Sequence, residues 1–87
     1  MSNSVWIFAG IGGHHAAGVF RDEERARQWI EKHRLNGVLT RYPLDTGLFD
    51  WAVEEGYLKP EPDQHAPEFI QQFSTGYLEH YHFEDGE

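Results

Sequence analysis

The sequence predicts an α+β fold: a small sheet of three or four strands, mostly antiparallel, with one main amphipathic helix packed on one face and one or two short helices. Three observations favour this class. Residues 5–9 form an uninterrupted apolar run rich in β-branched and aromatic side chains, which is typical of a buried strand. Residues 22–33 carry apolar side chains at helical spacing, and residues 77–83 alternate with the period of a strand.

The chain length predicts a single domain over residues 1–87, with its core between about residues 5 and 84. A domain of this size removes only about two-thirds of its unfolded surface from water, so its core needs large side chains. Six Phe, four Tyr and three Trp supply them.

A glycine-rich loop separates the first strand from a short second one. Residues 10–15 read GIGGHH, and glycines so close together mark a turn. Residues 18–20 (GVF) then favour a short strand, which we expect to pair with residues 5–9 across that loop.

The best-marked element is a helix over residues 22–33. Asp22 is a suitable N-cap, and two glutamates follow it in the first turn, where the helix dipole favours negative charge. The apolar stripe at i, i+3, i+4 and i+7 consists of Ala26, Trp29, Ile30 and His33. The Asn36-Gly37 pair predicts the end of the helix, because both residue types tolerate positive φ.

A third strand and a short helix are expected next. Residues 38–43 (VLTRYP) have strand propensity, and the strand should end at Pro43, which cannot donate to a ladder. Residues 48–55 favour a short helix capped by Asp45 or Thr46 and closed by Gly56.

The last third of the chain starts with a loop. Residues 59–67 contain three of the four prolines, and residues 68–73 predict another short helix in which Phe69 and Phe73 meet at i, i+4 spacing. Residues 77–83 then predict a final strand, with tyrosines 77 and 81, Glu79 and Phe83 on one face.

The charge is strongly asymmetric along the chain. The formal net charge is −8; residues 1–41 carry +2, whereas residues 42–87 hold one lysine against eleven acids. This balance argues against nucleic acid as the main partner, because binding to phosphates needs a basic surface. No apolar run is long enough to span a bilayer and no cysteine is present, so we expect no membrane association and a cytoplasmic location.

The order of motifs is similar to that of a known family. The segments VWIF, GVF, YPLD, DWA and EHYH, spread over about residues 5–86, resemble a short bacterial domain of unknown function that occurs as small acidic stand-alone proteins. The resemblance implies a single α+β unit and carries no catalytic residue or cofactor with it. Immunity proteins that neutralise toxins are also small, acidic and stand-alone, which offers an analogy at the level of protein class only.

The acidic second half predicts a surface for a basic protein partner. Its candidate residues are Asp45, Asp50, Glu54, Glu55, Glu79, Glu84 and Asp85. A negative potential of this kind speeds encounter with a basic partner, and carboxylates pair well with arginine and lysine. Aromatic residues close to these acids in sequence match the usual anatomy of an interface, an apolar centre inside a charged rim.

An alternative hypothesis is a metal-binding protein or a small metal-dependent enzyme. His80 and His82 fall on one face of the predicted last strand, and Glu84 continues that face if the strand persists. Two imidazoles and a carboxylate are a ligand set suited to zinc. A third hypothesis is a homodimer formed through an edge strand.

Apart from this metal hypothesis, no pattern predicts an enzyme or a bound cofactor. The glycine loop at residues 10–13 lacks the Gly-Lys-Ser/Thr ending of a phosphate loop and the full dinucleotide spacing. His14 and His15 have no serine or cysteine nucleophile in a recognisable setting nearby. The sequence therefore favours a non-enzymatic binding module.

Overall fold

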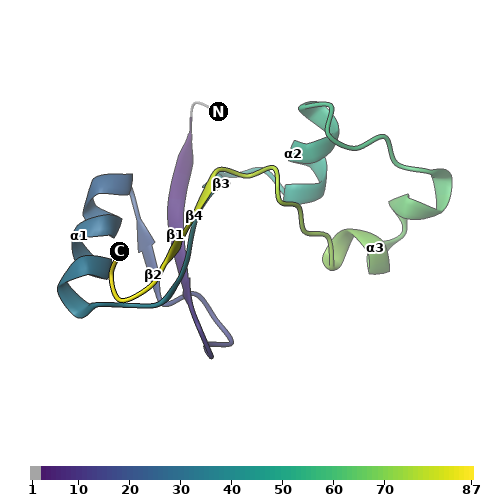
Figure 1. Ribbon diagram of the computed structural model, residues 1–87. Helices are drawn as coiled ribbons and strands as arrows, with labels where there is room; N and C mark the ends of the chain where they lie inside the picture. Colours follow the sequence, from purple (N-terminus) through teal and green to yellow (C-terminus); the bar gives the residue numbers. More distant parts are fainter. Residues whose placement is uncertain (1–2) are drawn as a thin grey trace. The chain divides into compact units, whose positions relative to one another are not determined.

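The computed structural model describes residues 3–87, and the chain divides into two compact units. Unit 1 comprises Met1–Leu44 and Leu78–Glu87, and unit 2 comprises Asp45–Tyr77. Unit 1 holds the strands and the longest helix, and unit 2 holds three short helical segments (Figure 1). The expectation that residues 1–87 fold as one domain stays a prediction.

Unit 1 is built on a four-stranded antiparallel sheet, which confirms the predicted α+β class. Its strands are β1 (Ser4–Gly10), β2 (Gly18–Phe20), β3 (Gly37–Pro43) and β4 (His80–Phe83), arranged in the order β2-β1-β3-β4. β1, β3 and β4 run side by side in Figure 1, although β4 closes the chain. β2 pairs with β1 across the glycine-rich loop, as the sequence predicts.

The strand register sorts side chains onto two faces of the sheet. Phe8 lies opposite Leu39, which in turn lies opposite Tyr81, so these three form one row on the same face. Phe8 and Leu39 are buried. Ile7 and Thr40 belong to the neighbouring row, whose side chains point to the other face.

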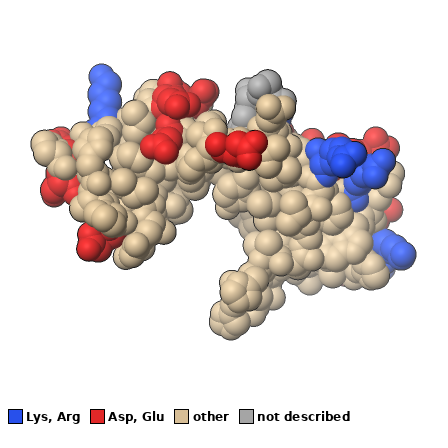
Figure 2. All heavy atoms as spheres, turned by 180° about the vertical axis from the view of Figure 1, so that it is seen from behind, with Lys and Arg blue, Asp and Glu red and all other residues tan. Residues whose placement is uncertain are grey.

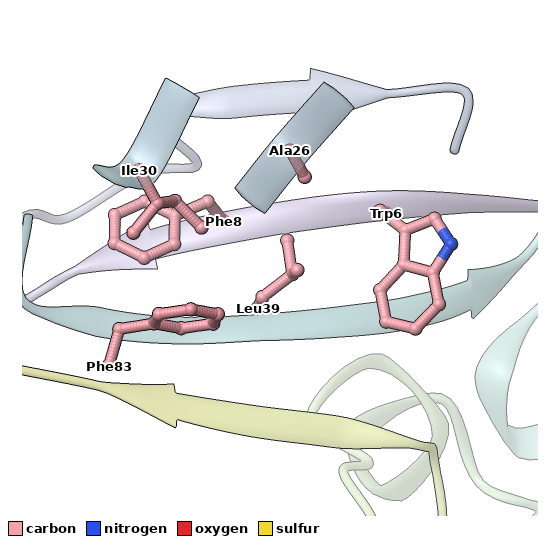
Figure 3. Close-up of a cluster of buried hydrophobic side chains, with 6 residues drawn as sticks. All are labelled: Trp6, Phe8, Ala26, Ile30, Leu39 and Phe83. Carbon is pink, nitrogen blue, oxygen red and sulfur yellow. The ribbon is translucent and has the colours of Figure 1, made fainter. Parts of the chain in front are cut away.

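Helix α1 (Glu23–His33) covers the face that holds Phe8 and Leu39. Its N-cap is Asp22, whose Oδ1 accepts a hydrogen bond from the Arg25 backbone N–H at 2.8 Å. Ala26 and Ile30 are fully buried and point from the helix towards the sheet (Figure 3). The hydrophobic core of this unit consists of Trp6, Phe8, Ala26, Ile30, Leu39 and Phe83.

The end of α1 differs from the prediction. The helix ends at His33, and the left-handed residue that follows is Arg34, with φ of 55°, instead of Asn36 or Gly37. The Arg34 N–H donates to the carbonyls of the last turn, as a helix C-cap does. Gly37 begins β3 instead, where its backbone lies against β1 and leaves no room for a Cβ.

The N-cap supplies a first prediction. Replacing Asp22 with Ala should lower the free energy of unfolding by about 1 kcal/mol, because the Arg25 N–H loses its acceptor. Urea denaturation followed by circular dichroism measures the change. Asp22→Asn keeps an acceptor at the same place and should cost clearly less. Equal losses in the two variants would contradict the capping role.

Unit 2 contains α2 (Leu48–Glu54), the 3-10 helix η1 (Pro62–His65) and α3 (Pro67–Gln71). The short helices near residues 48–55 and 68–73 are confirmed, whereas the predicted loop over residues 59–67 contains η1. The N-cap of α2 is Gly47, so the prediction of a cap at Asp45 or Thr46 is wrong.

Aromatic side chains form the interior of unit 2. Phe49 of α2 is buried, and its ring meets the rings of Phe69 and Phe73 edge-on at centroid distances of 6.0 and 5.8 Å. The predicted contact between Phe69 and Phe73 is present at 5.9 Å. Edge-to-face packing of this kind adds to the apolar burial.

The last strand is shorter than the alternation suggests. β4 begins at His80, whereas the pattern predicts a start at Tyr77. Its pairing with β3 runs from Gly37–Phe83 to Thr40–His80. Tyr77 instead closes unit 2.

Candidate interaction surface

Three of the predicted partner-binding acids surround one hollow in unit 2. Asp45, Asp50 and Glu54 line it together with Phe49 and His65. Asp50 and Glu54 are one helical turn apart on α2, so their carboxylates lie on the same side of the helix. The structure thus brings together acids that the sequence places within ten residues of one another.

Unit 2 has almost no positively charged side chains to balance its carboxylates. It carries seven acids and one base, Lys59, which gives a formal charge of −6. No ion pair forms among its residues, all of which lie in the described part of the chain. Carboxylates prevail on this unit over the face shown in Figure 2, whereas several basic side chains gather on unit 1.

An exposed aromatic stack lies in the same unit. The rings of Tyr57 and Tyr77 are parallel within 5°, with centroids 4.3 Å apart. Their exposed fractions are 47% and 64%, so both rings present surface to solvent. The buried ring of Trp51 lies 5.5 Å from Tyr57 and supports the stack from inside.

The remaining predicted acids do not join this group. Glu55 caps the C-terminal end of α2 and is exposed, without lining the hollow. Glu79, Glu84 and Asp85 belong to unit 1. Glu84 is exposed just beyond the end of β4.

Asp85 and Glu79 have partners within unit 1. The Asp85 carboxylate accepts two hydrogen bonds from the Arg34 guanidinium, and this contact lowers the pKa of Asp85 and raises that of Arg34. Glu79 accepts a hydrogen bond from the Tyr81 hydroxyl and lies 3.4 Å from Arg41. The hydroxyl contact chiefly lowers the pKa of Glu79, and it raises that of Tyr81.

The arginines of unit 1 also pack on its aromatic rings. The Arg27 guanidinium lies 4.7 Å from the centre of the Tyr81 ring and forms an ion pair with Glu23 at 2.6 Å. Arg41 lies 6.0 Å from the centre of the Trp6 ring. Most arginines of unit 1 thus contact acids or aromatic rings of the same unit.

His80 and His82 lie next to each other on β4. Both are exposed, and their ring centroids are 5.4 Å apart at an interplanar angle of 78°. Glu84 does not complete a three-ligand site with them, because β4 ends at Phe83 and the alternation stops there. Within residues 3–87, no group of three or more His, Cys, Asp or Glu side chains is arranged to hold a metal ion.

The residue that sequence reasoning missed is Tyr77. Its alternation with Glu79 and Tyr81 suggests a strand residue, whereas the structure stacks it on Tyr57, twenty positions earlier. No local pattern indicates this pairing. The only hint is that the segment between the two tyrosines contains three prolines, which mark turns and loops.

Among residues 3–87, no helix has the length and apolar character needed to cross a bilayer.

Comparison with known proteins places the chain in a family. No curated protein and no solved structure matches the chain significantly. A family model matches residues 5–87, nearly the whole sequence and both units. The chain therefore belongs to the family described as domain of unknown function DUF7710.

Proposed function

We propose that this chain is a non-enzymatic protein-binding module, and that unit 2 binds a basic surface of a partner protein. The observation that carries the proposal is the exposed Tyr57–Tyr77 stack in a unit of charge −6 whose carboxylates form no ion pair with any residue from 3 to 87. Unit 1, by contrast, pairs four of its eight acids with its own arginines.

The chemistry of this surface suits arginine and lysine side chains. The outer face of an exposed tyrosine ring attracts a cation, and arginine in particular stacks on such rings. Asp45, Asp50 and Glu54 offer carboxylates that guanidinium groups bind with two parallel hydrogen bonds. Tyrosine is also among the residue types that most often dominate binding energy.

The charge of unit 2 favours a basic protein over a second copy of the chain. Two units of charge −6 repel each other, and this opposes a homodimer formed through the same surface. The same charge accelerates encounter with a basic protein at low ionic strength. A partner that is itself a basic toxin, neutralised by this chain, is the narrowest form of the proposal.

The experiment compares four proteins in parallel pull-downs at low salt from a lysate of the source organism. Wild type should recover a basic protein that salt releases. The pair Asp50→Lys with Glu54→Lys should lose it. Tyr77→Ala should weaken binding by about tenfold or more, because truncating a dominant interface residue costs about 2 kcal/mol or more. Binding kinetics on the recovered protein provide these numbers.

The matched control is Glu31→Lys with Glu87→Lys in unit 1. It changes the net charge by the same amount at exposed positions outside unit 2. It should retain the partner. Equal binding by all variants, equal loss in both charge-reversed pairs, or no recovered basic protein would each overturn the proposal.

A further inference from the structure

The second feature that points to a ligand is the histidine pair on the outer strand of unit 1. β4 is an edge strand, because it pairs with β3 alone in the order β2-β1-β3-β4. The period of two along a strand puts His80 and His82 on one face, opposite the face of Tyr81 and buried Phe83. Both imidazoles are therefore side by side and open to solvent.

The arrangement of the two rings is compatible with one shared ion. Their centroids are 5.4 Å apart and their planes are close to perpendicular. Zinc binds imidazole nitrogen at about 2.0–2.1 Å. The ring centroids of two imidazoles on one tetrahedral ion are therefore about as far apart as those of His80 and His82. The exposed His82 side chain can change its rotamer to aim its ring at an ion held by His80.

A hydrogen bond already prepares His80 as a ligand. Its Nδ1 lies 2.7 Å from the backbone carbonyl oxygen of Leu78. A carbonyl oxygen can only accept, so Nδ1 carries the proton in this contact, and the neutral form of the ring then has its lone pair on Nε2. Metal-binding histidines usually donate their second ring N–H to a carbonyl or carboxylate in this way, which fixes the tautomer and the ring orientation.

We infer that His80 and His82 form a chelating pair for a divalent transition metal of the zinc, copper and nickel class, bound through the Nε2 atoms of both rings. Imidazole nitrogen prefers these ions, whereas magnesium and calcium take oxygen ligands. Water fills the other coordination positions, because no third side chain of the described residues joins the pair. The net charge of −8 raises the local concentration of cations.

The test is a Zn²⁺ titration of the full-length, tag-free chain by calorimetry, with histidine ring signals followed by NMR. Zn²⁺ should bind saturably, and the His80 and His82 signals should shift together, while Mg²⁺ has no effect. His82→Gln removes a proposed ligand and should weaken Zn²⁺ binding by about tenfold or more. Loss of a residue that only hydrogen-bonds to a ligand already costs about tenfold. A stoichiometry of one ion per chain, with both ring signals shifted, supports the inference.

The matched control is His14→Gln with His15→Gln, which removes the other neighbouring histidine pair of the chain. Zn²⁺ affinity should remain unchanged in this variant. The inference is overturned if wild type shows no saturable binding, if His82→Gln binds Zn²⁺ as wild type does, or if the control variant loses the site. None of these outcomes bears on partner binding through unit 2.

Discussion

Replacing Phe8 with Ala should lower the free energy of unfolding of unit 1 by about 3–5 kcal/mol, a large part of the stability of any small domain. Phe8 is 1% exposed and lies between α1 and the sheet (Figure 3). Its ring also meets Trp29 edge-on at 6.0 Å. The truncation removes apolar burial and leaves a cavity that surrounding side chains fill only in part.

Urea denaturation followed by circular dichroism measures this loss, and Ile11→Ala is its control. Ile11 is also apolar but is 81% exposed, so its truncation should change stability by no more than about 0.5 kcal/mol. If Phe8→Ala does not fold, Phe8→Leu keeps most of the apolar volume and should show a smaller loss in the same direction. A midpoint for Phe8→Leu no lower than that of Ile11→Ala would contradict the assigned core.

The elements that the sequence predicts well are those with local signals. The apolar run of β1, the short GVF strand and the capped helix α1 each owe their form to residues within one segment. Asp22 occupies the predicted cap, and the two fully buried helix residues, Ala26 and Ile30, belong to the predicted stripe. Sheet order and register follow less directly, because they depend on pairing between distant segments.

The errors in the fold have causes outside the local sequence. Gly37 is read as a helix terminator, but its need for space arises from Ala9 and Gly10 on the neighbouring strand. The left-handed conformation that the sequence assigns to Asn36 or Gly37 is taken by Arg34, at the end of α1. The alternation before β4 likewise misleads, because Tyr77 is held by Tyr57 instead of by a strand partner.

The candidate surface was predictable only in part. Asp45, Asp50 and Glu54 are close in sequence and remain close in the structure. Glu79 and Asp85 pair with Arg41 and Arg34, which lie 38 and 51 positions earlier in the sequence. No local sequence pattern predicts these ion pairs. Which of the predicted acids form ion pairs thus depends on residues far away in the sequence.

Replacing Gly37 with Ala is the second change with a large expected effect. A Cβ at this position would lie 2.3 Å from the Ala9 carbonyl oxygen and 2.7 Å from Cζ of Phe8. The first of these atoms belongs to the backbone of β1, which pairs with β3 at this point through Gly10. Since backbone cannot rotate out of the way, the two central strands would have to move apart at their ends, at a cost of about 1–3 kcal/mol.

Gly76→Ala provides the comparison for this substitution. A Cβ at Gly76 would meet no atom within 4 Å, so Ala there should leave stability unchanged or raise it slightly by restricting the unfolded chain. Urea midpoints of the two variants separate a steric cause from a general effect of losing glycine. If Gly37→Ala unfolds at the wild-type midpoint, β1 and β3 are not in contact at this pair. If both variants lose stability equally, the cause is not the close approach of the two strands, because only Gly37 faces a neighbouring strand.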